Sequence, residues 1–141
     1  MSQTYISVEL RRQVISRANN CCEYCRLSSE DSLFSFQIDH IIPEKHDGET
    51  IFSNLALSCA SCNGFKGSEI ASYDKDSGLL TPLYSPRIQI WDEHFQLDGA
   101  TIKPVSSIGR VTVKILKLNR DEHIKERISL IRLGRYPCNK K

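Results

Sequence analysis

The sequence predicts an α+β fold in which a short β-hairpin is held by a structural metal site, between an N-terminal helix and C-terminal helices. Apolar residues recur at helical spacing in 7–18, 108–119 and 121–133, which predicts helices there. Residues 34–38 and 54–58 have strand patterns, and a Cys-x-x-Cys pair lies near each of them. A chain of 141 residues is long enough for one domain with a hydrophobic core, so we expect a single domain over 1–141.

The remaining segments are expected to connect these elements. Pro43 ends the first strand, and a polar loop over 44–53 with an Asp-Gly turn leads to the second. Residues 60–72 predict a turn and a short helix, whereas 74–90 read as an extended loop rich in Asp, Gly and Pro. Residues 91–105 predict a small hairpin that turns at Asp98-Gly99.

Charge is distributed unevenly along the chain. The net charge is only +2, but residues 1–100 carry −6 and the basic, helical part at 101–141 carries +8. A basic segment beside an acidic body suggests an anionic partner such as nucleic acid. Solvated surface helices explain the same pattern equally well.

No secretory signal or apolar run long enough to span a membrane is visible. We therefore expect a cytoplasmic protein without a membrane partner. Structural disulfides are rare in that compartment, so the six cysteines favour metal binding.

The two Cys-x-x-Cys pairs predict a structural zinc site made of Cys22, Cys25, Cys59 and Cys62. Each turn can supply two thiolates, and two such turns complete a tetrahedron. Buried thiols or redox-active thiols are the alternative. Cys21 and Cys138 have no such partner spacing and are expected to be free thiols.

The segment between the zinc ligands carries an Asp-His pair. Asp39 is a hard oxygen ligand suited to magnesium or manganese, and His40 can accept a proton at neutral pH. Adjacent residues on a regular strand point to opposite faces, so the two converge only if the strand bends.

The order of these motifs (CxxC, IDHIIP, NLALSC and CxxCNxxKG) resembles the HNH endonuclease family over residues 21–69. The resemblance implies a ββα-metal core, in which two strands and a helix surround one divalent cation, and DNA as the substrate. It also implies cleavage that leaves 3′-hydroxyl and 5′-phosphate ends. The rest of the chain, especially residues 85–95 and 109–119, looks like the C-terminal part of stand-alone bacterial HNH proteins.

The family roles carry over by position. His40 matches the general base that activates water, and Asn54 matches the residue that steadies the loop carrying this base. Asp39 and Asn63 match the ligands of the catalytic Mg²⁺ or Mn²⁺. Because Asn63 stands where many members have histidine, the chain has the H-N-N form of the motif.

Five basic residues are candidate nucleic-acid contacts, because phosphate binding needs clustered charge and no strict motif. They are Lys66, Arg87, Arg110, Lys114 and Lys117. Ordinary wet helix faces are the alternative for the last three. We expect His46 to lie in a solvated loop, His94 and Trp91 to pack in the interior, and His123 to be exposed.

Three functions remain open from sequence alone. The leading prediction is a metal-dependent endonuclease acting on DNA. The alternative is a non-catalytic four-cysteine zinc module that binds nucleic acid or protein. A thiol oxidoreductase is disfavoured, because the Cys-x-x-Cys pairs lack a thioredoxin-like context. Substrate preference and oligomeric state cannot be predicted from the sequence.

Overall fold

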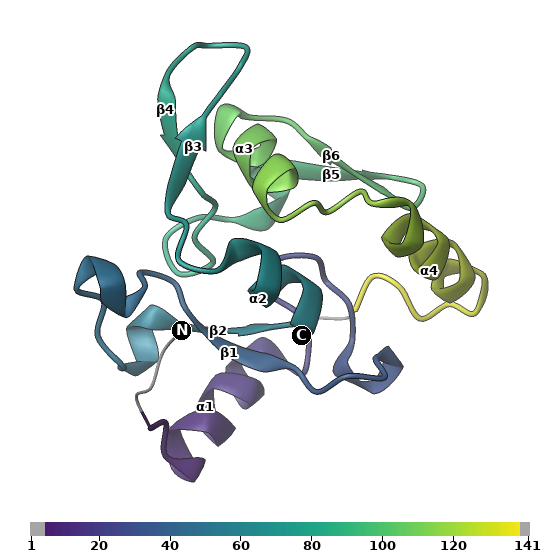
Figure 1. The fold of residues 1–141 in the computed structure, drawn as a ribbon. Coiled ribbons are helices and arrows are strands. Elements are labelled where there is room, and N and C mark those ends of the chain that lie inside the picture. The colour runs from purple at the N-terminus through teal and green to yellow at the C-terminus, as the bar shows by residue number, and fades with distance from the viewer. Residues whose placement is uncertain (1–4, 139–141) are drawn as a thin grey trace.

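The computed structural model describes residues 5–138 (Figure 1). Short 3-10 turns separate its regular elements, and this mixed content confirms the predicted α+β class. No helix in this described range is both long and apolar enough to cross a bilayer. The elements are α1 (Val8–Ala18), β1 (Gln37–His40), β2 (Leu55–Ser58), α2 (Ala60–Lys66), β3 (Ala71–Tyr73), β4 (Leu80–Pro82), β5 (Phe95–Asp98), β6 (Thr101–Pro104), α3 (Ser107–Ile115) and α4 (Asp121–Arg132).

Helix α1 forms where the sequence predicts it. The Ser7 hydroxyl accepts a hydrogen bond from the Leu10 N–H at 3.1 Å, which caps the N-terminus. Asn19 ends the helix in the left-handed region at φ 54°, a conformation that asparagine tolerates better than most residues. The buried side chains of Val14 and Ala18 pack against Leu55 and Leu57 of β2.

Strands β1 and β2 form an antiparallel hairpin with a different helix on each face (Figure 1). Ile38 lies opposite Leu57, and both belong to the cluster that α1 covers. Asp39 lies opposite Ala56, which faces the core containing the four-cysteine cluster. The hairpin is therefore the middle layer between α1 and α2.

The C-terminal part packs two further hairpins, β3–β4 and β5–β6, against α3 (Figure 1). The β5–β6 hairpin turns at Asp98-Gly99 as predicted. Strand β4, however, lies within the segment 74–90 that was expected to be an extended loop. Asp74 explains the difference: its carboxylate accepts from the Ser77 N–H, and its N–H donates to the Leu79 carbonyl, which closes a tight turn.

Helix α3 ends at Ile115, four residues before its predicted end. Lys117 adopts φ 50°, which breaks the helix. Asn119 then bonds both the N–H and the carbonyl of Ile102 at 2.9 Å, so its amide acts as a partner for strand β6. This side-chain pairing draws the chain away from the helix axis, and periodicity alone could not predict it.

Cys21 and Cys138 are bonded as a disulfide, so the prediction of two free thiols is wrong. The two residues are 117 positions apart in sequence, which hid their proximity. The C-terminal segment returns to the first zinc turn, where the Cys138 N–H donates to the Arg26 carbonyl and the Tyr136 hydroxyl to the Cys25 carbonyl. His123 is also half-buried and not exposed as expected.

Arg110 and Asp74 form a bidentate ion pair at 2.8 and 2.9 Å that ties α3 to the β3–β4 turn. The hydrogen bonds from Arg110 hold the pKa of Asp74 below its usual value. This pair therefore stabilises the fold above the unfolded pKa of aspartate and loses its effect as pH falls through the folded pKa.

We expect Arg110→Gln to have a lower free energy of unfolding than the wild type at neutral pH. This difference should shrink as the pH falls below about pH 4.

Urea unfolding across a pH series measures that difference. Lys103→Gln removes an exposed basic residue without a partner in the described chain and serves as the control. A difference of constant size at every pH would show that the ion pair does not explain the role of Arg110.

Candidate active site and metal centre

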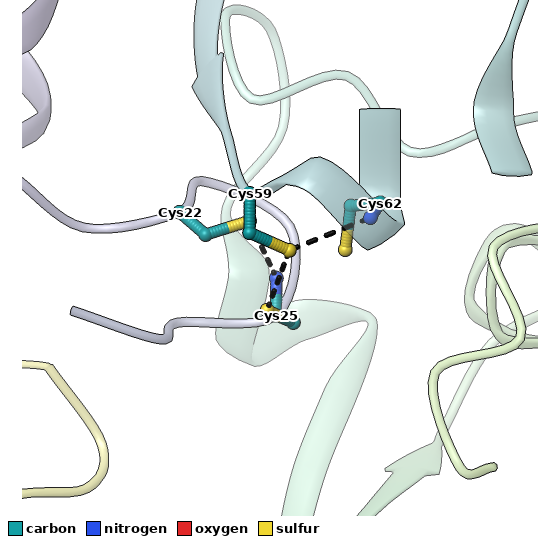
Figure 2. Close-up of side chains that lie close together, drawn as sticks. All are labelled: Cys22, Cys25, Cys59 and Cys62. Atoms are coloured by element: carbon teal, nitrogen blue, oxygen red, sulfur yellow. Dashed lines mark hydrogen bonds between the residues drawn. The ribbon is translucent and has the colours of Figure 1, made fainter. Parts of the chain in front are cut away.

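The four predicted zinc ligands converge in the core (Figure 2). Cys22 and Cys25 lie in the turn after α1, Cys59 caps the N-terminus of α2, and Cys62 lies in its first turn. The ligand atoms lie within 4.8 Å of one another, and the sulfurs of Cys25 and Cys59 are 3.7 Å apart. The cluster therefore joins a turn from before the β1–β2 hairpin to the helix that follows it.

This geometry fits a tetrahedral zinc ion. Thiolate sulfurs bind zinc at about 2.3 Å, which places neighbouring ligand sulfurs about 3.8 Å apart. In each pair a backbone N–H donates to the first sulfur at 3.4 Å, from Cys25 to Cys22 and from Cys62 to Cys59. The four cysteines are thus compatible with the structural zinc site of an HNH domain.

Shared hydrogen bonds shift the pKa values of three thiols of the cluster in different directions. Burial alone would raise the pKa of Cys22, but hydrogen bonds from Cys25, Cys59 and Cys62 lower it well below its usual value. The hydrogen bonds with Cys22 act in the opposite direction on Cys25 and Cys62, and they raise the pKa values of both thiols.

Strand β1 presents Asp39 and His40 to opposite faces of the hairpin, as regular strand geometry requires. Asp39 points toward α2, where its carboxylate meets Lys66. His40 lies on the face that α1 covers, together with Ile38. Both residues nevertheless line one cleft of about 940 Å³.

Asp39 is 4% exposed and is bonded at both oxygens. The Tyr24 hydroxyl donates to Oδ2 at 2.7 Å, and the Lys66 ammonium donates to Oδ1 at 3.2 Å. Burial raises the pKa of Asp39, while the charge of Lys66 and the bond from Tyr24 act in the opposite direction. Each carboxylate oxygen keeps a second lone pair, which is the capacity that a cation would need.

The ring of His40 is fixed by a residue from the following loop. Its Nε2 lies 2.9 Å from the hydroxyl oxygen of Thr50. When Nε2 donates this bond, Nδ1 carries the lone pair that can accept a proton. The sequence analysis missed Thr50, because a single threonine in a polar loop gives no recognisable signal.

Asn54 closes the loop between the strands. Its side-chain oxygen accepts from the Ile42 N–H at 2.9 Å, and its amide group donates to the carbonyls of Ile42 and Glu49. Gly48 is required at the crossing, because a Cβ there would lie only 1.6 Å from the Ile42 carbonyl oxygen. Asn54 thus occupies the loop-holding position proposed for it, although its effect on catalysis stays a prediction.

Asn63 extends from the middle of α2 and lines the same cleft as Asp39 and His40. Its oxygen and that of Asp39 are hard donors, the type that magnesium and manganese prefer. The predicted ligands and the predicted base are therefore brought together around one opening.

Two of the basic residues predicted to contact phosphate instead bond to other groups of the protein. Lys66 is 2% exposed and donates to the carbonyls of His40 and Ile41 in addition to Asp39. Arg87 forms an ion pair with buried Glu23, whose second oxygen accepts from a backbone N–H of β2. Both cations hold the hairpin in place.

The three predicted contacts in the C-terminal part also make internal contacts. Arg110 binds Asp74, and the Lys114 ammonium donates to the Tyr73 carbonyl at 2.7 Å. Lys117 lies over the ring of Phe65, 5.8 Å from its centre. None of these five basic residues lines the cleft that contains His40. Their contact with nucleic acid stays a prediction.

Comparison with known families decides what this arrangement is. Residues 22–69 match the model of the family described as HNH endonuclease. This segment is an HNH domain. The match includes both cysteine pairs, the Asp39-His40 pair, Asn54 and Asn63, and it confirms the resemblance seen in the sequence.

A curated relative extends the similarity beyond the HNH domain. The Septu protein PtuB of Bacillus thuringiensis is 23% identical over 113 residues, which include 79% of this chain and 41% of the relative. The chain thus spans about two fifths of the length of that relative. No solved structure gives a significant match.

The cysteine cluster leads to a prediction about metal content. Purified protein should contain about one zinc per chain, because four thiols complete the coordination shell. Cys62→Ser should lose the zinc and unfold, since a structural zinc site supplies a large part of the folding free energy. Native mass spectrometry and circular dichroism measure both effects.

Cys138→Ser is the matched control, because this residue lies outside the cluster. It should keep the zinc. Full zinc occupancy in Cys62→Ser, or full stability after the metal is stripped by a chelator, would contradict a structural role for the cluster.

The buried pair of Lys66 and Asp39 leads to a second prediction. Lys66→Met leaves a buried carboxylate without its counter-ion, which should lower the free energy of unfolding by about 3–5 kcal/mol. Adding Asp39→Asn should restore part of the loss, because the double variant has no unpaired charge. Lys45→Met, at an exposed lysine, should change the free energy by less than about 0.5 kcal/mol. Additive effects of the two core substitutions would contradict the pairing.

Proposed function

We propose that this chain is a divalent-cation-dependent nuclease that hydrolyses phosphodiester bonds of DNA. The main support is that Asp39, His40 and Asn63 line one cleft and all belong to the HNH domain. These residues supply a base and two hard oxygen donors, the groups that phosphodiester hydrolysis requires. The DNA substrate and the cytoplasmic setting are part of the proposal.

In this proposal His40 activates water. Its Nε2 donates to Thr50, which sets the plane of the ring and leaves Nδ1 to accept a proton from water. Asn54 holds the loop that carries Thr50 at its end, so the position of the base depends on hydrogen bonds outside the cleft. A general base placed in this way contributes about 10²- to 10⁴-fold to the rate.

Asp39 and Asn63 would hold the catalytic cation, magnesium or manganese. When bound, this cation offsets the negative charge that develops on the phosphate and the leaving oxygen. Tyr24 and Lys66 fix the orientation of the Asp39 carboxylate before any ligand arrives. We expect products with 3′-hydroxyl and 5′-phosphate ends.

One observation favours the alternative of a non-catalytic zinc module. Both oxygens of Asp39 already bond to protein groups, so its carboxylate could serve only to join β1 to α2. A module of this kind needs neither the imidazole of His40 nor the amide of Asn63. Substitution of His40 therefore separates the two functions.

Cleavage of supercoiled plasmid in magnesium or manganese tests the proposal. We expect wild-type protein to nick or linearise the plasmid and His40→Ala to be slower by about 10²- to 10⁴-fold. EDTA should abolish cleavage, and Asn63→Ala should raise the cation concentration needed for half-maximal rate.

His46→Ala is the matched control, because His46 is an exposed histidine of the same loop region whose ring lies 3.2 Å from the Ser68 carbonyl oxygen. It should cleave at close to the wild-type rate. Equal activity of wild type and His40→Ala on plasmid, branched and single-stranded DNA would sink the nuclease proposal in favour of the binding module.

A further inference from the structure

A second hollow adjoins the catalytic cleft. It has a volume of about 330 Å³ and lies between α1 and the segment that precedes β1. Arg11 and Ile38 belong to the walls of both hollows, so the two meet at these side chains. We call these two adjoining hollows the depression beside β1; His40 lines the first of them and Phe34 the second.

The outer edge of β1 borders this depression. Among the described strands β1 pairs only with β2, so its other edge has no strand partner. Helix α1 forms the wall on one side, and it lies before the segment that matches the HNH family. The depression therefore combines the family domain with an element outside it.

Arg11 places a positive charge in the middle of the depression. The side chain is exposed and has no hydrogen bond or ion pair within the described chain. Its neighbour Arg12 differs, because it pairs with Glu9 at 3.2 Å and lines neither hollow. Arg17 likewise donates to backbone carbonyls. Arg11 is thus available to an anionic ligand beside the catalytic cleft.

An exposed aromatic side chain lies at the far end. Phe34 is 71% exposed and lines the second hollow next to Leu33, which is 98% exposed. Apolar side chains this exposed gain nothing from the folded chain itself. A phenyl ring beside a cationic groove is the arrangement on which unpaired bases stack in single-strand-binding proteins.

We propose that this depression binds an unpaired nucleic-acid strand that leads into the catalytic cleft. Arg11 binds a backbone phosphate next to the scissile one, and the ring of Phe34 stacks on a base beyond it. A duplex keeps its bases stacked inside, so Phe34 selects for single-stranded or unpaired substrate. The inference rests on the proposed nuclease function, because it extends the path of the strand from the same cleft.

Binding to fluorescent oligonucleotides in the inactive His40→Ala background tests the path without cleavage. Phe34→Ala should weaken single-strand binding about 10- to 100-fold, which corresponds to the loss of one base–aromatic stack. Phe34→Trp should retain affinity, and Phe34→Leu should not, because leucine keeps the apolar bulk without a π-face. Arg11→Gln should reduce the slope of log K against log salt by about 0.7, the change expected for one phosphate contact to a single strand.

Two variants serve as matched controls. Arg12→Gln removes an equal charge one position along α1, and Tyr73→Ala removes an exposed aromatic ring from the β3–β4 hairpin. Both should bind like the parent, and all variants should show the melting temperature of the parent.

Two ligands are compared: a single-stranded DNA and a single-stranded RNA of the same sequence. Comparable affinity for DNA and RNA would show that the depression contacts the phosphates and bases. A higher affinity for one of them would show which sugar, deoxyribose or ribose, the depression prefers.

Equal affinity for duplex and single strand, unchanged by Phe34→Ala, would contradict the proposed single-strand binding path. The outcome for the nuclease is separate. Cleavage of single-stranded substrate that survives Arg11→Gln and Phe34→Ala unchanged would reject the path and leave the nuclease intact. Loss of single-strand binding in these variants, in a protein that never cleaves, would keep the path and reject the nuclease.

Discussion

The convergence of four buried thiols is the constraint on which the rest of this structure depends. Cys22 and Cys25 precede the β1–β2 hairpin, and Cys59 and Cys62 follow it directly. Joining the two pairs fixes the start of α2 relative to β1, which places Asn63 and Lys66 over the strand. A small hairpin is marginally stable by itself, and a zinc ion held by the four thiols would add the stability that its few residues do not provide.

The two faces of the β1–β2 hairpin carry different functional groups. Asp39 faces α2 and is held by Tyr24 and Lys66, whereas His40 faces α1 and is held by Thr50. The two side chains have different hydrogen-bond partners, but Lys66 also donates to the His40 carbonyl. In the proposed reaction, the cation-binding side and the water-activating side are therefore coupled through the strand backbone and through Lys66.

Much of this arrangement could be predicted from local sequence. The four zinc ligands and the hairpin follow from short local patterns, and the HNH domain follows from the resemblance of the motif order to that family. The supporting contacts could not, since Tyr24, Glu23 and Arg87 meet their partners only after folding. The ion pair of Arg110 with the buried carboxylate of Asp74 could not be predicted for the same reason, since the two residues meet only in the tertiary structure.

The wall that α1 contributes to the cleft has a consequence for how such proteins diverge. Helix α1 lies outside the segment that defines the family, yet its Arg11 borders the opening that contains His40. Exchange of that flanking helix between relatives would carry a different set of side chains to the same reactive groups. Under the proposed function, new substrate preferences could thus be inherited through the neighbouring helix while the reactive core passes unchanged from one lineage to the next.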